Sequence, residues 1–185
     1  ALGEYKRSND WMKTAYYVHQ TTGGMSAGNG SLMRCLPVAL YYNDVEKILQ
    51  ITALQSTLTH YDQQATDACM FYNLLVYQYL NGKPKIPCIR KYVKMYPEYK
   101  QVFQLSKEEL KPMGYVFDTL ICVLWCFINT FSFEDAICEA ANLGGDADTI
   151  AAITGGMAGV YYGYNAIPDR WKEKILVKEQ LTSIA

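Results

Sequence analysis

The chain contains 185 residues, of which 50% are hydrophobic and 19% are charged. This length and composition fit one globular domain with a substantial core, and they exclude a disordered chain. The formal net charge of −1 gives no overall attraction to nucleic acid or to an acidic membrane, so we expect neither as a partner.

Helical periodicity dominates the sequence, and no alternating strand pattern of useful length occurs. The segments that we expect to be helical are residues 43–59, 62–80, a short piece within 84–97, a turn opened at 106–109, and then 114–130, 132–142, 149–164 and a last helix from Pro168. Residues 114–130 are apolar on all sides, which predicts a central buried helix. We therefore expect a single compact all-α domain over residues 1–185.

Several of these boundaries carry capping signals. Asn43 or Asp44 can cap the first predicted helix, and Ser106 opens a capping box with a glutamate three residues later. Ser132 precedes the helix that runs to Asn142. The last helix is predicted to be amphipathic, with one apolar side made by Trp171, Ile175 and Leu176.

The six cysteines are scattered and include no Cys-x-x-Cys pair, and the chain has only two histidines. This pattern argues against a zinc site. Most of the cysteines fall in apolar helical stretches, where a free thiol packs as a small hydrophobic group. We therefore expect a reducing, cytoplasmic compartment. No signal peptide is recognised at the start, and the most apolar run, residues 119–131, is too short to cross a bilayer.

The run LGGDADTI places Asp146, Asp148 and Thr149 directly after Gly144 and Gly145. Three closely spaced oxygen donors are typical of a site for Mg²⁺ or a similar hard cation. Residues two apart on a regular helix point to different sides, so a shared cation requires a loop or a helix start. The alternative is that Asp148 merely caps the following helix and Asp146 is solvated, and this run by itself favours neither interpretation.

A second run, SAGNGSLMR at residues 26–34, leads from small and turn-forming residues into a helix-like segment. Such an arrangement offers backbone N–H groups to a phosphate or diphosphate. Asn29 could bond a ribose hydroxyl, and Arg34 adds positive charge or pairs with a carboxylate. The alternative is an ordinary Asn-Gly turn.

Two further residues are candidates for a binding cleft. His60, in the run THYD, falls at a helix junction, where it could bind a ligand or could be structural. Tyr115 follows Gly114 just before the central helix, and its ring could lie against a base or ribose or simply pack. His19 has no recognisable partner, and we interpret it as structural.

Four stretches, in this order, resemble the ADP-ribosylglycohydrolase family: GNGSLMR at 28–34, THYD at 59–62, MGYVFDTLICVLW at 113–125 and NLGGDADTIAAITGGMAGVYYG at 142–163. IPDRW at 167–171 closes the match, which covers nearly the whole chain from Ala27. The resemblance implies an all-helical fold and a centre of two Mg²⁺ ions, or Mn²⁺. It also implies hydrolysis of the N- or O-glycosidic bond that joins ADP-ribose to a protein side chain or a small acceptor.

The resemblance further implies roles for individual residues. Asp146, Asp148 and Thr149 would be metal ligands, and either aspartate would also act catalytically by orienting a water. The residues that would contact ADP-ribose or line its cleft are Gly28, Asn29, Gly30, Ser31, His60 and Tyr115. Bond cleavage at the anomeric carbon passes through an oxocarbenium-like transition state, which paired cations and carboxylates can stabilise.

Two motifs typical of the family do not occur in this sequence: a Gly-Asp-x-x-Gly stretch with a nearby glutamate, and a Thr-Asp-Asp-Thr cluster that supplies the opposite metal ligands. Only Glu4 and Asp10 are acidic among the residues before Gly28. Two cations within about 4 Å of each other repel strongly and need carboxylates on both sides. Three explanations stay open: a truncated or processed chain, an N-terminal half supplied by another polypeptide, or a degenerate descendant. In the last case the chain would be a non-catalytic ADP-ribose-binding or structural protein.

Overall fold

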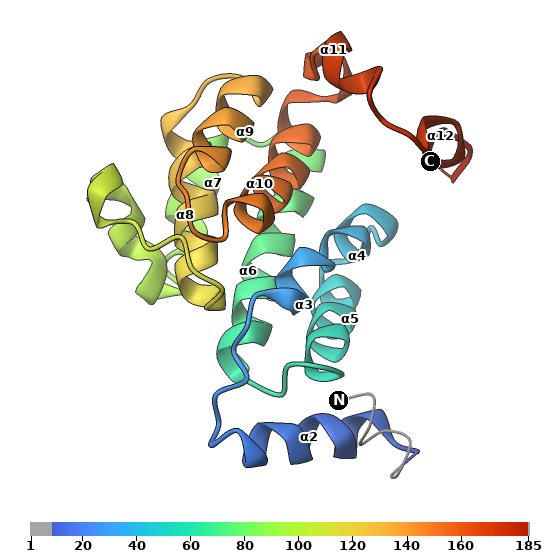
Figure 1. Ribbon diagram of the computed structural model, residues 1–185, viewed down its shortest axis with the longest axis vertical. Coiled ribbons are helices and arrows are strands. Elements are labelled where there is room, and N and C mark those ends of the chain that lie inside the picture. Colours follow the sequence, from blue (N-terminus) through green and yellow to red (C-terminus); the bar gives the residue numbers. More distant parts are fainter. Residues whose placement is uncertain (1–8, 185) are drawn as a thin grey trace.

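The computed structural model describes residues 9–184, and this part of the chain is helical with no named strand (Figure 1). The α-helices are α2 (Trp11–Thr21), α3 (Gly30–Met33), α4 (Leu36–Tyr41), α5 (Val45–Thr57), α6 (Gln63–Leu80), α7 (Lys85–Tyr92), α8 (Val116–Asn129), α9 (Phe133–Ala141), α10 (Ala147–Tyr162), α11 (Asp169–Lys172) and α12 (Lys178–Ile184). Short 3₁₀-helices are η1 (Pro97–Phe103), η2 (Lys107–Glu109) and η3 (Tyr164–Ala166). The expectation of an all-α fold is confirmed.

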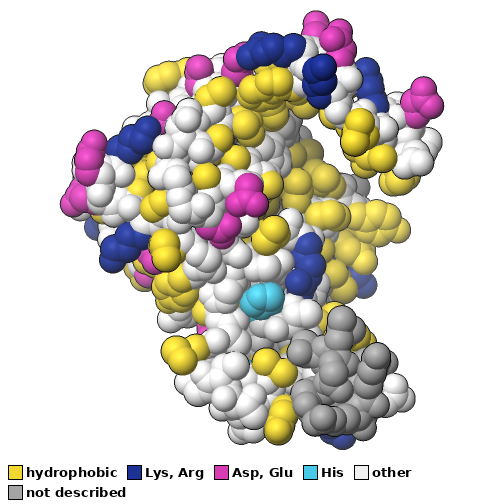
Figure 2. Space-filling model, viewed as in Figure 1, with side chains coloured by type: hydrophobic (Ala, Val, Ile, Leu, Met, Phe, Trp, Pro, Cys, Tyr) yellow, Lys and Arg dark blue, Asp and Glu magenta, His cyan; other side chains and the backbone are white. Residues whose placement is uncertain are grey.

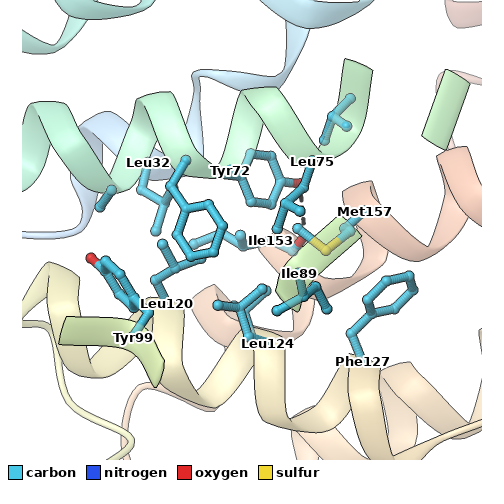
Figure 3. Close-up of a cluster of buried hydrophobic side chains, with 14 of the residues drawn as sticks. Leu32, Tyr72, Leu75, Ile89, Tyr99, Leu120, Leu124, Phe127, Ile153 and Met157 are labelled. Atoms are coloured by element: carbon cyan, nitrogen blue, oxygen red, sulfur yellow. Dashed lines mark hydrogen bonds between the residues drawn. The ribbon is translucent and has the colours of Figure 1, made fainter. Parts of the chain in front are cut away.

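Helix α6 lies at the centre of the helical body and packs against α5, α4, α8 and α10 (Figure 1). Its Phe71, Tyr72 and Leu75 are completely or almost completely buried. The Tyr72 hydroxyl donates a hydrogen bond of 2.9 Å to the backbone oxygen of Ile153, which ties α6 to α10 inside the core (Figure 3). Burial of side chains of this size contributes about 1.5–3 kcal/mol each.

Helix α8 is the central apolar helix that the sequence predicted. Its Leu120, Leu124 and Phe127 have no exposed surface and face the same cluster (Figure 3). The C-terminal end of α8 is capped by the buried Lys85, whose Nζ donates to the backbone oxygens of Phe127, at 2.8 Å, and Thr130, at 2.6 Å. An ammonium group is favourable there because it satisfies carbonyl groups at the negative end of the helix.

Most of the predicted capping signals act as expected. Asp44, not Asn43, caps α5, because its carboxylate accepts from the backbone N–H of Glu46 at 3.0 Å. Ser132 caps α9 in the same way through the N–H of Asp135. The capping box opened by Ser106 is also present.

The helix predicted from Pro168 begins there, but it is shorter than predicted. Helix α11 ends at Lys172, and Ile175 and Leu176 do not form an apolar side against the body, because Leu176 is 100% exposed. Trp171 still packs edge-on against Phe133, with ring centroids 6.1 Å apart. Beyond that contact the chain leaves the body (Figure 1). A short amphipathic helix depends on tertiary packing for its stability, and within residues 9–184 no surface covers Leu176.

Helices α2 and α4 were not predicted. Asp10 caps α2, since its carboxylate accepts from the N–H groups of Met12 and Lys13. The contact of α2 with the rest of the chain includes an edge-to-face pair of Tyr16 with Tyr61 at 5.2 Å. All six cysteines are free thiols. No helix in residues 9–184 is long and apolar enough to cross a membrane.

Candidate functional site

The glycine turn is fastened to the segment that precedes α8. The backbone N–H of Asn29 donates to the oxygen of Gly114 at 3.0 Å, and the N–H of Val116 donates to the oxygen of Ala27 at 3.0 Å. Between these bonds Gly28 and Tyr115 form an isolated antiparallel bridge. Two of the sequence candidates, far apart along the chain, therefore lie side by side.

The acidic run adopts a backbone that requires glycine. Gly144 and Gly145 have φ of 77° and 59°, in the left-handed region. A Cβ atom on Gly145 would lie only 2.0 Å from the backbone oxygen of Pro112. This close approach lets the N–H of Asp146 donate to the same oxygen at 2.9 Å. The run is thus fixed on the loop before α8, and α10 begins immediately after Asp146.

A short hydrogen bond joins the glycine turn to the acidic run. Asn29 Nδ2 donates to Asp146 Oδ2 at 2.6 Å and to Thr119 Oγ1 at 3.0 Å, and Thr119 Oγ1 in turn donates to the oxygen of Met113 at 2.8 Å. Asn29 is only 9% exposed. A hydrogen bond to a carboxylate in such a place contributes about 1.5–3 kcal/mol. Because its Nδ2 already donates to these two oxygens, Asn29 positions Asp146, and its Oδ1 is the atom left for a ligand.

The interpretation of Asp148 as a helix cap is wrong. The N-cap of α10 is Asp146, and its side chain makes no capping hydrogen bond. Asp148 lies exposed in the first turn of α10, and Thr149 beside it is buried. All three residues therefore lie at the start of one helix, which is where a cation shared by residues two apart requires them. Within residues 9–184, however, no group of three or more His, Cys, Asp and Glu residues could hold a metal ion.

His60 lies against the glycine turn. A Cβ atom on Gly30 would lie 3.0 Å from His60 Cε1, and one on Gly28 would lie 3.4 Å from Nε2. Burial of the ring lowers the pKa of His60, the nearby positive charge of Arg34 lowers it further, and Asp62 acts in the opposite direction. The ring is therefore biased toward its neutral form. In the view of Figure 2 a histidine lies next to a basic side chain, and a group of acidic side chains lies farther up on the same face.

Tyr115 stands at the rim of the same region. It is 40% exposed, and its hydroxyl donates to Gln64 Oε1 at the start of α6. Gln64 also lines a hollow of about 530 Å³, together with His19, Thr57, Tyr61, Asp62, Gln63 and Thr66. The polar lining of this hollow suits a polar ligand. A larger hollow of about 830 Å³ lies between α7 and η1, and no predicted site residue lines it.

Ser31 lies buried beneath the glycine turn. Ser31 has no exposed surface, and its Oγ accepts a hydrogen bond of 3.0 Å from Ser56 Oγ and one of 3.5 Å from Cys69 Sγ. In this position Ser31 supports the glycine turn from the side of the core, and its hydroxyl does not face the surface.

The comparisons with known proteins decide the family. The sequence profile of the ADP-ribosylglycohydrolase family matches residues 2–185. This chain belongs to the ADP-ribosylglycohydrolase family. It is 32% identical over 170 residues to ADP-ribosylarginine hydrolase Tri1 of Serratia proteamaculans, a match that covers 86% of this chain and 46% of that protein. It is 31% identical over 168 residues to the ADP-ribosyl-[dinitrogen reductase] glycohydrolase of Rhodospirillum rubrum, covering 88% of this chain and 57% of that protein.

A solved structure described as an ADP-ribosylglycohydrolase-related protein complex is similar to the fold, with a TM-score of 0.78 at 30% identity. The match covers 97% of this chain and 68% of that one. The chain spans about half the length of the curated relatives that it matches. In this family member, the glycine turn, His60, Tyr115 and the acidic run fall in one region of the fold.

Some residues of that region were not predicted from the sequence. Thr119 bonds Asn29, Gln64 bonds Tyr115, and Gln55 accepts a hydrogen bond of 2.8 Å from Arg34 through its backbone oxygen. Each of these partners is distant in the sequence, and only Thr119 lies within one of the stretches that carry the family resemblance. Among residues 9–184, the acceptors that Arg34 reaches are neutral oxygens and not a carboxylate.

Proposed function

We propose that this chain carries part of the active site of an ADP-ribosyl glycohydrolase that removes ADP-ribose from arginine side chains of proteins. The observation that supports this most is the 2.6 Å bond from Asn29 to Asp146, which joins a turn suited to a diphosphate with a run suited to a cation. The choice of arginine rests on the Tri1 relative, whose name states that substrate.

The donor set at the start of α10 fits a divalent cation such as Mg²⁺ or Mn²⁺ from one side. Asp146 Oδ2 is held by Asn29, while Oδ1 has no hydrogen-bond partner in residues 9–184. Asp148 is exposed and carries the second carboxylate. When bound, such ions orient ribose hydroxyl groups and increase the acidity of a water. The carboxylates for the opposite side of a two-ion centre would come from outside the described residues.

The residues of this chain would then act on ADP-ribose as follows. Backbone N–H groups at Gly28 and Gly30 would donate to the diphosphate, and the His60 ring lies against the same two glycines. Asp146 and Asp148 place negative charge beside the anomeric carbon as it becomes positive, and either one can accept a proton from the attacking water. His60 and Tyr115 would contact the ligand beside the turn.

Release of free ADP-ribose from an ADP-ribosylarginine peptide tests this proposal. We expect release in Mg²⁺ when the chain is supplied with a segment that carries a Thr-Asp-Asp-Thr cluster, loss of release in EDTA, and recovery when Mg²⁺ is added again. Asp146→Asn keeps the side-chain shape and should abolish release, whereas Asp169→Asn, an exposed carboxylate on α11, should leave it unchanged. If no release is seen even when a segment with a Thr-Asp-Asp-Thr cluster is supplied, the hydrolase proposal is wrong.

A second candidate is a protein that binds ADP-ribose without cleaving it. It is favoured by the finding that no metal-holding group of three or more His, Cys, Asp and Glu residues occurs in residues 9–184. Calorimetric titration with ADP-ribose separates the two candidates. Binding without any release of ADP-ribose from the peptide supports the binding protein, and metal-dependent release rules it out.

A further inference from the structure

Two hydrogen bonds link Arg34 to His60. Arg34 follows α3 directly, and its Nη2 donates to Thr59 Oγ1 at 2.5 Å and to the backbone oxygen of Gln55 at 2.8 Å. Thr59 Oγ1 lies 2.8 Å from His60 Nδ1. The backbone under these side chains is also fixed, because the N–H groups of Thr59 and His60 both donate to the oxygen of Ser56.

The donors and acceptors in this chain determine where the imidazole hydrogen lies. A guanidinium group can only donate, so Thr59 Oγ1 accepts from Arg34. The hydroxyl keeps one hydrogen of its own, and within the described residues the only acceptor that this hydrogen reaches is His60 Nδ1. Nδ1 therefore accepts, and a neutral imidazole then carries its hydrogen on Nε2.

The environment of the ring disfavours the alternatives. An imidazolium would place a second positive charge beside Arg34 in a half-buried position. The other neutral tautomer would put a hydrogen on Nδ1, and the Thr59 hydroxyl would then have no protein acceptor. It would also turn a lone pair at Nε2 toward the glycine turn, where an anionic ligand would be repelled.

The ring edge of His60 that carries Cε1 and Nε2 faces the turn. Nε2 lies 3.2 Å from the position of a Cβ on Gly30 and has no hydrogen-bond partner among residues 9–184. We infer that Arg34 and Thr59 are positioning residues that hold His60 as the neutral Nε2–H tautomer, so that this N–H donates to an oxygen of the substrate at the glycine turn. Only the identity of that substrate as ADP-ribose rests on the proposed function.

Nitrogen-15 NMR of the ligand-free protein tests the tautomer directly, because protonated and unprotonated imidazole nitrogens have well-separated shifts. The chain has only two histidines, and His19, whose Nδ1 lies 2.6 Å from Ser26 Oγ, is an internal control for folding. We expect His60 to show an unprotonated Nδ1 and a protonated Nε2. Thr59→Val should give a mixture of tautomers while leaving His19 unchanged, and Thr59→Ser should restore the single tautomer. A protonated Nδ1 in the wild-type chain overturns the inference.

Calorimetric titration with ADP-ribose tests the consequence for binding. The loss of one well-oriented hydrogen bond corresponds to about fivefold to tenfold weaker binding for Thr59→Val, and at least as much for His60→Ala. Thr59→Ser should bind within about twofold of the wild type. If Thr59→Val binds as tightly as the wild type while His60→Ala does not, the positioning role is wrong. Failure of the wild-type chain to bind ADP-ribose contradicts the proposed function instead, and the NMR result then still decides the tautomer.

Discussion

Gly145 gives the sharpest test of how the acidic run is held. Alanine at this position meets two separate costs. Its φ of 59° is a left-handed conformation, which costs a residue with a side chain about 1–2 kcal/mol. Its Cβ would also lie 2.0 Å from the oxygen of Pro112, so the loop must move and the bond from Asp146 N–H to that oxygen is lost. That bond contributes about 0.5–1.5 kcal/mol.

Together these effects predict that Gly145→Ala lowers the free energy of unfolding by about 1.5–3.5 kcal/mol. Gly144→Ala is the matched control, because its φ of 77° carries the same conformational cost but no atom lies within 4 Å of the added Cβ. Urea unfolding of both variants measures the difference. Equal destabilisation by the two alanines would show that the contact with Pro112 does not hold the run.

Three further predictions concern the turn and His60. Asn29→Ala should lower the free energy of unfolding by about 1–3 kcal/mol in urea unfolding, because it leaves Asp146 Oδ2 and Thr119 Oγ1 without their donor; no loss of stability would contradict the bond. Gly30→Ala places a methyl group 3.0 Å from His60 Cε1 and should weaken ADP-ribose binding in calorimetry more than Gly28→Ala, whose methyl group lies 3.4 Å from His60 Nε2. Folding lowers the pKa of His60 from its usual 6.5. Between the folded and unfolded pKa values, the unfolded chain therefore binds more protons than the folded chain. The contribution of His60 to the free energy of unfolding is thus complete above about pH 6.5 and declines as the pH falls toward the folded pKa. His60→Gln should flatten that part of a plot of unfolding free energy against pH, and an unchanged slope would contradict the shift.

The parts of the fold that could be predicted from the sequence are those set by local interactions. Asp44 and Ser132 cap helices through bonds to residues two or three positions away, and such bonds are visible in the sequence itself. The helix expected from Pro168 ends earlier than predicted for the opposite reason. Its apolar residues Ile175 and Leu176 needed a surface to pack on, and no local pattern says whether one exists.

The candidate site shows the same division. The composition of the acidic run indicated a cation, but the partner that holds Asp146 is Asn29, which lies far away in the sequence. The two runs could be joined in advance only through the family resemblance. The burial of Ser31 beneath Ser56 and Cys69 depends on how α5 and α6 pack, so it could not be predicted from the sequence position of Ser31 in the glycine turn.

The central claim is that the glycine turn and the acidic run form one binding site. Backbone amide chemical shifts of the ¹⁵N-labelled chain, recorded during a titration with ADP-ribose in Mg²⁺, test it most directly. We predict that the amides of residues 28–30 and 146–149 shift together, with one common Kd. Shifts confined to the hollow between α7 and η1, or different Kd values for the two segments, would contradict a single site.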